Sequence, residues 1–334
     1  MVNVLVLTLW HAVCNEMCSE TLEDYSRQGT VKVTAVYDVD EERGRKYAQR
    51  FGADFEPDVD KALARADVDA VINLSPMVMH KDLIIKAARA GKAIYTEPPI
   101  ALTLEDAKEV RKVIDETGVL FVHNTIHIFD QDILLAKKII DAGYIGKIVK
   151  LHIRHSGDGV SSGRLPDYWT DRSMLPGGAI MDMGPHGLEQ ILYLMGGTPE
   201  RISAFATSPY GSQMRDEFSI ATLYYADDAI ALLEAGLVNY RAPYIVEIVG
   251  TDGSFTRCGD QITVMCKELG TMNFNMKEEP LSIVIPKPQI KFLEACIRGD
   301  KTSPENLGIE FAEDMAVVMA KIEDATASHS IVEL

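Results

Sequence analysis

The sequence predicts an α/β protein with two domains: a doubly wound parallel sheet first, and then an α+β domain with an open, mainly antiparallel sheet. Three observations predict it. An apolar run at residues 2–7 is followed by a helix-forming stretch and by a second apolar run, Val31–Asp38, which ends in an acid. Strand-like and helix-like segments then alternate to about residue 123, which favours parallel strands covered by helices on both faces. From residue 201 to about residue 285 strand follows strand, which favours an antiparallel sheet.

The N-terminal segment, residues 1–123, has the rhythm of a Rossmann-type dinucleotide-binding domain. We expect a helix at residues 41–51, a strand at 69–74, a helix at 81–90, a strand at 93–96, a helix at 104–117 and a strand at 119–123. Thr103 is the expected N-cap of the helix at 104–117, because its hydroxyl can accept from a backbone N–H of the first turn.

The C-terminal segment, residues 124–334, changes character. We expect a helix at 131–142, a strand at 147–155, and a loop from residue 176 that runs into a helix at 184–195. Strands are expected at 202–207, 218–225, 230–238, 245–250, 254–257 and 262–266, and helices at 289–298 and 309–327. The last helix is able to pack back on the first domain.

Composition limits the partners. The chain has 334 residues, of which 47% are hydrophobic and 25% charged, and its formal charge is −17. This charge disfavours nucleic acid or an anionic membrane surface as a partner. No apolar run is long enough to span a membrane, and no basic region precedes the first apolar strand, which disfavours a signal peptide. Five scattered cysteines suit a reducing compartment, so we expect a cytoplasmic protein.

The turn after the first strand lacks glycine. A dinucleotide-binding unit carries G-x-G-x-x-G there, because glycine lets the pyrophosphate approach the backbone. This chain reads Thr8-Leu9-Trp10-His11-Ala12-Val13, so Trp10 stands at the second glycine position. A helix N-terminus still offers free N–H groups whatever its side chains are, but the bulk of Trp10 is able to fill the pyrophosphate volume.

Several further motifs point to one family. They are Tyr37-Asp38, Asp67–Pro76 followed by His80, Ala90–Lys92, Tyr95–Thr103, Gly143–Lys147, Gly177–His186 and Glu247–Ser254. Their order and spacing over nearly the whole chain resemble the glucose–fructose oxidoreductase/inositol dehydrogenase (Gfo/Idh/MocA) family. The resemblance implies a dinucleotide-binding domain, a C-terminal domain whose open sheet often forms the oligomer interface, and chemistry on sugars, cyclitols and related polyols with NAD or NADP.

One further departure concerns catalysis. The family's Glu-Lys-Pro motif, whose lysine helps to polarise the reacting hydroxyl, is here Glu97-Pro98-Pro99. Proline can neither donate nor accept a proton, and Lys92 lies at the far side of the strand at 93–96.

The resemblance implies that Asp182 and His186 belong to the active site, with the histidine as acid or base. An imidazole with its ordinary pKa of about 6.5 serves either way at neutral pH. The alternative for this Asp-x-x-x-His pair is a helix cap and a packed core histidine.

For the cofactor, the sequence and the resemblance together single out Thr8, Trp10, His11, Asp38, Ser75, Pro76, His80 and Glu97. Asp38 ends the second strand, where an acid binds the adenosine ribose and selects NAD over NADP. The alternative is a turn residue. Glu97 is expected to line the nicotinamide side.

The candidates for binding the substrate are His127, His155, Tyr168, Trp169 and Glu189. On its strand His155 faces away from His152, because the two differ by an odd number of residues. His127, Asp182 and His186 form a weaker candidate set for a divalent metal, which would replace the electrophile lost with the lysine. Tyr168 and Trp169 are able to stack on a sugar face.

The function predicted first is an NAD-linked oxidoreductase of a sugar, cyclitol or related polyol with an atypical cofactor loop. The second is a non-redox isomerase, lyase or hydrolase on the same scaffold, aided by a metal. The third is a sugar-binding protein without catalysis. We also expect a homodimer or homotetramer.

Overall fold

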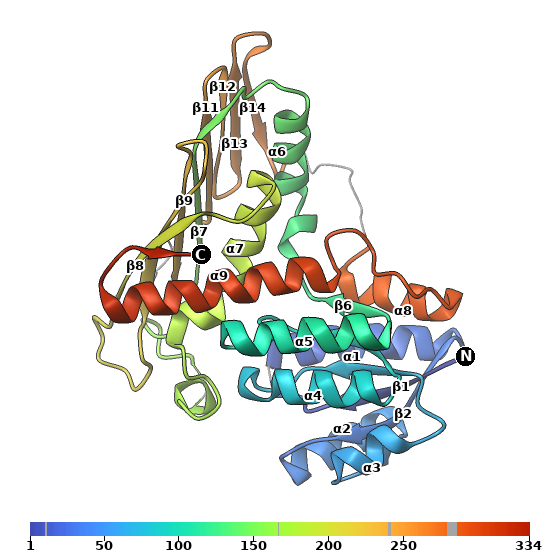
Figure 1. Cartoon of the computed structure of the whole chain (residues 1–334). Helices are drawn as coiled ribbons and strands as arrows, with labels where there is room; N and C mark the ends of the chain where they lie inside the picture. Colours follow the sequence, from blue (N-terminus) through green and yellow to red (C-terminus); the bar gives the residue numbers. More distant parts are fainter. Residues whose placement is uncertain (11, 166, 240–241, 279–285) are drawn as a thin grey trace. The chain divides into compact units, whose positions relative to one another are not determined.

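The computed structural model describes residues 1–10, 12–165, 167–239, 242–278 and 286–334 (Figure 1). It divides into two compact units. Unit 1 comprises Met1–Thr125 and Pro286–Ala316, and unit 2 comprises Ile126–Ile285 and Val317–Leu334. Compactness thus assigns Pro286–Ala316 to unit 1, whereas the predicted boundary at residue 123 left this segment in the second domain. As a functional division, that boundary stays a prediction.

Unit 1 is built on a six-stranded parallel sheet among the described residues, with the order β3-β2-β1-β4-β5-β6. Its strands are β1 (Val2–Leu7), β2 (Val31–Tyr37), β3 (Asp54–Phe55), β4 (Ala70–Asn73), β5 (Ala93–Thr96) and β6 (Phe121–His123). Every residue of β4 is buried, as expected for a strand covered on both faces. The predicted doubly wound parallel sheet is confirmed.

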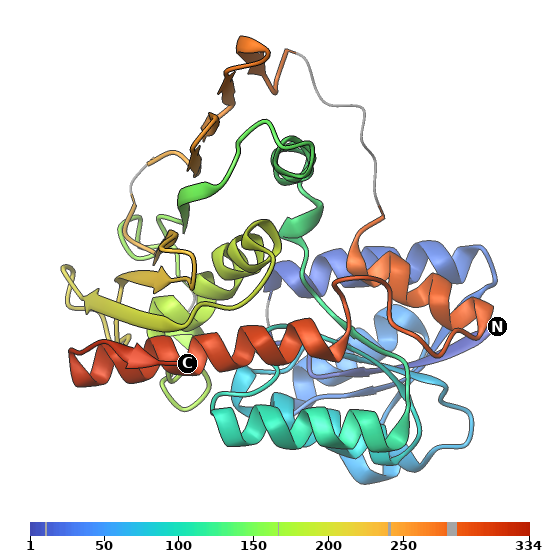
Figure 2. The same ribbon diagram turned by 45° about the horizontal axis from the view of Figure 1, so that its top comes forward.

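Helices cover both faces of this sheet. They are α1 (Ala12–Arg27), α2 (Glu41–Phe51), α3 (Val59–Ala64), α4 (Met77–Arg89), α5 (Leu104–Thr117) and α8 (Pro288–Arg298). Figure 2 shows α1 and α8 on one side of the sheet and α5 on the other. The predicted cap of α5 is confirmed, since the Thr103 hydroxyl accepts from Asp106 N at 3.1 Å and Gly118 ends the helix with a φ of 60°.

Unit 2 is built on a nine-stranded sheet among the described residues, in the order β14-β13-β12-β11-β7-β10-β9-β8-β15. Its strands are β7 (Ile148–Ser156), β8 (Arg201–Thr207), β9 (Phe218–Tyr224), β10 (Ile230–Gly236), β11 (Ile245–Gly250), β12 (Gly253–Cys258), β13 (Gln261–Cys266), β14 (Gly270–Asn275) and β15 (Val332–Glu333). Neighbouring strands are antiparallel except β7 and β10, which are parallel. The predicted open, mainly antiparallel sheet is confirmed.

The helical segments of unit 2 are η1 (His127–Phe129), α6 (Gln131–Asp141), η2 (Asp167–Thr170) and α7 (Gly178–Met195), while α9 (Ile309–Ser328) begins in unit 1 and ends in unit 2. The predicted start of α7 at residue 184 is wrong, because the helix begins six residues earlier. Asp182 and His186 therefore both lie inside α7, and neither caps it. Within the described residues, no helix combines the length and the apolar character needed to cross a bilayer.

One face of the nine-stranded sheet is covered by α7, which packs on β7, β9 and β10. Large apolar side chains are exposed on the strands, and Phe205 and Ile220 stand opposite each other in the β8–β9 register with exposed fractions of 65% and 39%. An exposed apolar patch on a sheet face is typical of a protein–protein interface. This arrangement agrees with the predicted oligomer, which stays a prediction.

We expect the protein to form a homodimer or homotetramer through this face. Phe205→Glu places a charge in the patch and should shift the protein to monomers at micromolar concentration, as measured by light scattering. Val39→Glu, at an exposed valine of unit 1, is the control. A monomeric unaltered protein would contradict the prediction.

Candidate functional site

The carboxyl ends of the parallel strands of unit 1 deliver polar residues to one edge. The strand order reverses between β1 and β4, and ligands of open α/β sheets bind at this switch point. Thr8 follows β1, Asp38 follows β2, Asn73 ends β4 and Glu97 follows β5, and all four are buried. This edge is where a dinucleotide site is expected.

Thr8 keeps the tight turn that glycine makes in the motif. Its φ is 46°, in the left-handed region that β-branched residues rarely adopt. Its N–H donates to the carbonyl of Tyr37 at 2.7 Å, and Trp10 N donates to the carbonyl of Leu74 at 3.2 Å. The loop is thereby held to the ends of β2 and β4. The turn survives without its first glycine, at the cost of a strained backbone.

Trp10 is 9% exposed, so the indole lies mostly among neighbouring protein atoms rather than in solvent. Its position at the second glycine of the motif keeps it as the candidate obstacle to a pyrophosphate. His11, also predicted to contact the cofactor, lies outside the described residues.

Asp38 is fully engaged within the chain. Its carboxylate accepts from Arg43 through Nε at 2.9 Å and Nη2 at 2.6 Å, from Leu9 N at 2.9 Å and from Asp40 N at 2.9 Å. The bond from Asp40 N is that of a turn residue, the alternative raised by the sequence. A ribose would have to share this carboxylate with Arg43, and ribose binding by Asp38 stays a prediction.

His80 links two loops at the same edge. One ring nitrogen lies 2.7 Å from the carbonyl oxygen of Ser75 and the other 2.7 Å from that of Pro99. Burial lowers the pKa of this imidazole, and the two carbonyls act against this shift because each favours an N–H on the nitrogen beside it. Pro76 stands at the N-cap of α4 without a side-chain cap. His80 thus fixes the loops after β4 and β5, and the sequence pattern alone did not indicate this linking role.

Glu97 is held by its neighbours in unit 1. Its carboxylate accepts from Asn124 Nδ2 at 2.8 Å and lies 3.5 Å from the Tyr95 hydroxyl. The bond between Pro98 and Pro99 is cis. Three buried oxygens at this edge, Thr8 Oγ1, Ser75 Oγ and Asn124 Oδ1, have no hydrogen-bond partner within the described part of the chain. Such oxygens suit a polar ligand, because an unsatisfied buried group is costly.

Unit 2 holds a separate group, which we call the histidine cluster: His127, His155, His186 and Glu189. The ring centroids lie 4.6 Å apart for His127 and His155, 5.0 Å for His127 and His186, and 5.3 Å for His155 and His186. The three rings come from η1, β7 and α7. Of the two histidines on β7, only His155 belongs to the cluster, and their odd spacing predicted that they face opposite ways. His152 instead pairs with Glu234 at 2.8 Å.

Two contacts orient the cluster. Asp130 Oδ2 lies 2.8 Å from His127 Nδ1, so a proton on Nδ1 leaves Nε2 as the lone-pair nitrogen of the neutral ring. Glu189 is fully buried and its carboxylate accepts from the backbone N–H of His127. Sequence reasoning missed Asp130, whose spacing of three residues from His127 was the available signal.

The candidate metal set needs a correction. One ligand atom each of His127, His186 and Glu189 lies within 4.8 Å of the others, and no set containing Asp182 is found among the described residues. Asp182 stands four residues before His186 on α7, whereas Glu189 stands three residues after it. Glu189 therefore takes the third place in the set, and the sequence had assigned it to the substrate.

Asp182 titrates in an unusual range. Burial raises the pKa of this carboxyl to about 7, against a hydrogen bond from Trp169 that lowers it. Burial and the neighbouring His127 lower the pKa of His155 to about 3, so this ring stays neutral. An acid with a pKa near neutrality is suited to proton transfer. The side chain of Tyr168, predicted to stack on a sugar, lies outside the described residues.

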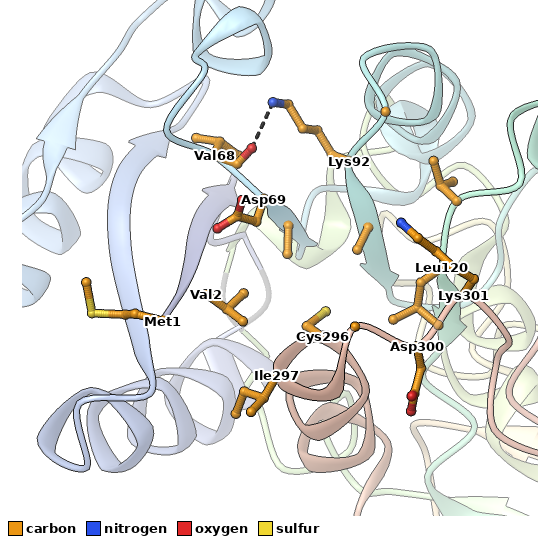
Figure 3. A pocket seen from close by; sticks show the side chains of 15 residues that line it. Met1, Val2, Val68, Asp69, Lys92, Leu120, Cys296, Ile297, Asp300 and Lys301 are labelled. Atoms are coloured by element: carbon orange, nitrogen blue, oxygen red, sulfur yellow. Dashed lines mark hydrogen bonds between the residues drawn. The ribbon is translucent and has the colours of Figure 1, made fainter.

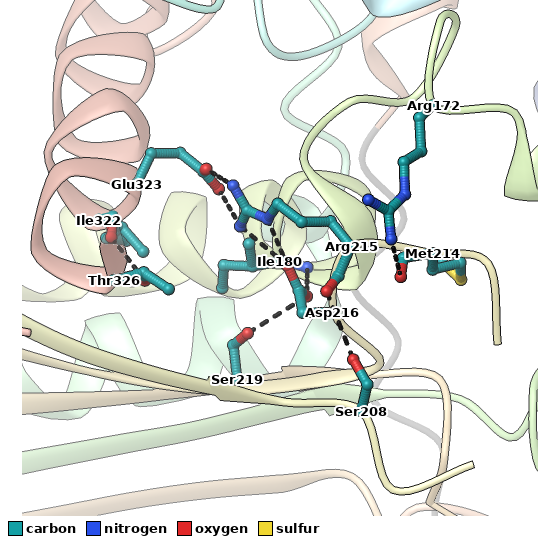
Figure 4. Close-up of polar contacts among 10 residues, drawn as sticks. All are labelled: Arg172, Ile180, Ser208, Met214, Arg215, Asp216, Ser219, Ile322, Glu323 and Thr326. Atoms are coloured by element: carbon teal, nitrogen blue, oxygen red, sulfur yellow. Dashed lines mark hydrogen bonds and ion pairs between the residues drawn. The ribbon is translucent and has the colours of Figure 1, made fainter. Parts of the chain in front are cut away.

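A cap from a distant residue holds α7 in place (Figure 4). Asp216 accepts from Ile180 N at 3.1 Å through its carboxylate and from Ala179 N at 3.0 Å through its carbonyl. Arg215 bonds the same carboxylate at 2.8 Å and also pairs with Glu323. A Cβ on Gly178 would lie 2.7 Å from the Asp216 carboxylate, which is why glycine is needed there. Asp216 thereby positions the helix that carries His186.

A hollow of about 450 Å³ lies at the opposite edge of the unit 1 sheet, where β1, β4 and β5 begin (Figure 3). Lys92, Cys296 and Lys301 contribute to its lining. Lys92 donates to the carbonyl of Val68 at 2.8 Å. None of the predicted site residues lines this hollow.

Comparison with known proteins decides the family. Residues 14–125 match the model of the oxidoreductase family with an NAD-binding Rossmann fold, and residues 133–256 match that of the GFO/IDH/MocA C-terminal domain. The chain belongs to the GFO/IDH/MocA family. The resemblance predicted from its motifs is confirmed.

Curated relatives of this GFO/IDH/MocA protein have diverse names. A 2,7-anhydro-N-acetylneuraminate hydratase of Mediterraneibacter gnavus is 30% identical over 75% of this chain and 66% of its own length. The hydratase of that name in Escherichia coli is 32% identical over 67% and 60%. This chain therefore spans under two thirds of either hydratase. A scyllo-inositol 2-dehydrogenase (NAD⁺) of Bacillus subtilis is 28% identical over 81% of this chain and 80% of its length.

Among solved structures, a levoglucosan dehydrogenase in complex with NADH and L-sorbose has a TM-score of 0.84 and 19% identity. The alignment covers 100% of this chain and 98% of that one. At this identity the likeness shows the shared fold.

Thr8→Gly should stabilise the protein by about 1 kcal/mol in urea unfolding without ligand, because it removes the left-handed strain on a β-branched residue. Thr34→Gly is the control, since that buried threonine lies in the interior of β2 and its loss should destabilise by a similar amount. Equal destabilisation by both changes would contradict the strain argument.

Asp182→Asn should gain stability relative to the unaltered protein as pH rises from about 4 to about 7. The folded-state pKa is raised to about 7 from 3.8, so ionisation of the buried carboxyl costs stability as pH rises through this window. The difference grows toward a few kcal/mol, at about 1.4 kcal/mol for each pH unit. The measurement is the unfolding free energy against pH. Asp227→Asn, at a carboxylate that is 78% exposed, should show no such trend.

Proposed function

We propose that this GFO/IDH/MocA chain is an NAD-linked oxidoreductase acting on a sugar, cyclitol or related polyol. Unit 1 binds the dinucleotide, and the histidine cluster of unit 2 supplies the groups that handle the proton. The observation that carries the proposal is the loop after β1, which keeps its turn at Thr8 although the glycine motif is absent.

The residues at the carboxyl edge fit a dinucleotide. Thr8 Oγ1, Ser75 Oγ and Asn124 Oδ1 are buried oxygens that lack partners within the described residues, and they offer hydrogen bonds to a polar ligand. Asp38 would hold the adenosine ribose, which favours NAD over NADP, and Glu97 would line the nicotinamide side. When bound, the cofactor accepts or returns the hydride of the reacting carbon.

In this proposal His186 transfers the proton of the reacting hydroxyl group. A neutral imidazole takes the hydroxyl proton when a polyol is oxidised and returns it in reduction. Asp182, with its pKa near 7, lies one turn before His186 on α7 and is able to share the proton. Asp216 holds their helix in place. His127, His155 and Glu189 are the candidate partners of substrate hydroxyls, and Trp169 is a candidate to stack on a sugar face.

Relatives support the substrate class. The names scyllo-inositol 2-dehydrogenase and levoglucosan dehydrogenase belong to proteins that act on a cyclitol and an anhydro sugar. A second candidate function is a net non-redox reaction of the lyase class. Pro98 favours it, because the lysine that normally aids hydride transfer is missing, and two relatives are named hydratases.

The cofactor proposal is tested by Trp10→Gly. If the indole fills the pyrophosphate space, the unaltered protein should bind NAD(H) more weakly than micromolar, and the variant should bind at least tenfold more tightly by calorimetry or NADH fluorescence. A micromolar dissociation constant corresponds to about −8 kcal/mol. Trp169→Phe, in unit 2, is the control and should leave the affinity unchanged. Micromolar binding by the unaltered protein would show that the loop does not obstruct NAD.

The catalytic proposal is tested by His186→Ala. Turnover should fall by about 10²–10⁴-fold, the usual contribution of general acid–base catalysis, while folding is retained. The measurement is the initial rate on a panel of sugars and cyclitols with NAD. His152→Ala, at a histidine paired elsewhere, is the control. Pro98→Lys should raise dehydrogenase activity. If the rate survives His186→Ala within about threefold, the histidine is structural.

A further inference from the structure

The histidine cluster has a property that proton transfer does not require. His127 and His186 place two imidazoles beside the carboxylate of Glu189, with one ligand atom of each within 4.8 Å of the others. Two histidines and one carboxylate are a common ligand set for zinc and for other divalent transition metals. Glu189 stands three residues after His186 on α7, so both side chains lie on one face of the helix.

The contacts around His127 are those of a metal-ligating histidine. Such a histidine nearly always donates its second ring N–H to a carboxylate or carbonyl, which fixes the tautomer. Asp130 Oδ2 lies 2.8 Å from His127 Nδ1 and is the carboxylate in this case. The lone pair of Nε2 is then available. The backbone N–H of the same residue also holds the carboxylate of Glu189, so one short segment orients two of the three ligands.

The third histidine points to an occupant of the cluster. His155 Nδ1 is buried and has no hydrogen-bond partner among the described residues. Its ring lies 4.6 Å from that of His127 and 5.3 Å from that of His186, measured between centroids. A metal with three protein ligands keeps an open position for water. Such a water would supply the donor that Nδ1 lacks.

We propose that His127, His186 and Glu189 form a binding site for Zn²⁺, and that occupancy of this site excludes proton transfer by His186. Tetrahedral zinc, with bonds of about 2.0–2.2 Å, holds its ligand atoms about 3.4 Å apart, so the three side chains must close by rotamer adjustment. The metal takes the lone pair that His186 would use as a base. Zinc is therefore an inhibitor. The inhibition rests on the proposed function, whereas the zinc-binding site does not.

Metal binding is measured first, without turnover. Chelator-treated full-length protein is titrated with Co²⁺, whose visible absorption reports tetrahedral coordination, and Zn²⁺ is then added in competition. The background is Cys258→Ser, because the exposed thiol is itself a soft ligand. We expect one site for each chain, weakened at least tenfold in both Glu189→Gln and His127→Asn.

The matched control is His152→Asn, which removes a histidine of β7 that pairs with Glu234 of β10, and it should leave the affinity within twofold. Glu189→Gln keeps an oxygen to accept from His127 N–H, so its fold is expected to survive, and circular dichroism checks both variants. The site is refuted if the unaltered protein binds the metal no more tightly than the two variants.

Inhibition is measured second. Zinc should reduce turnover over the concentration range in which it displaces cobalt, and chelator should restore it. Stoichiometric binding without inhibition would overturn the exclusion of proton transfer. Normal turnover without metal binding would overturn the zinc site and leave the proposed function intact. Metal binding by a protein that neither binds NAD nor turns over a substrate would overturn the proposed function and leave the zinc site intact.

Discussion

The second unit depends on a carboxylate that arrives at a helix from a distant loop. Asp216 accepts backbone N–H groups of the first turn of α7, which no residue of the helix itself caps. The first-turn N–H groups of a helix need partners, and a negative charge there also complements the helix dipole. Because α7 carries Asp182, His186 and Glu189, the geometry of all three follows from this cap.

A different constraint governs the first unit. Parallel strands place all their carboxyl ends at one edge, so the residues after β1, β2, β4 and β5 must meet there whatever their chemistry. Several polar groups at this edge form hydrogen bonds with other groups of the chain. Asp38 is occupied by Arg43, and His80 links the loops that follow β4 and β5. A ligand entering the edge would replace some of these contacts and satisfy the buried oxygens that have no partner within the described residues.

Local pattern predicted the elements well where local forces decide them. The cap at Thr103, the buried strands and the opposite directions of His152 and His155 all follow from short-range periodicity. Local pattern failed where an element depends on a residue that is distant in the sequence. The early start of α7 depends on Asp216, 36 residues from the Ile180 N–H that it accepts.

The backbone strain at Thr8 and the composition of the metal set were not predicted, for other reasons. A threonine gives no sign that it will adopt a φ of 46°, because the strain is imposed by the strands on either side. Glu189 stands in the metal set in place of Asp182 because its carboxylate lies near both histidines, whereas the sequence pattern had assigned it to the substrate. The predicted roles of His11 and Tyr168 stay predictions.

The position of β7 has a kinetic consequence. This strand comes first in its sheet along the chain, yet it lies in the centre, with β8, β9 and β10 on one side and β11 to β14 on the other. Each flanking group is joined by sequence-adjacent antiparallel pairs, so each is able to assemble early. To join the two groups through β7, the chain must close the long loop between β7 and β10. The conformational entropy of this loop is lost before the hydrogen bonds of the parallel β7–β10 pair are formed. We therefore expect the docking of these two groups of strands onto β7, the strand that bears His155, to be slower than the formation of each group.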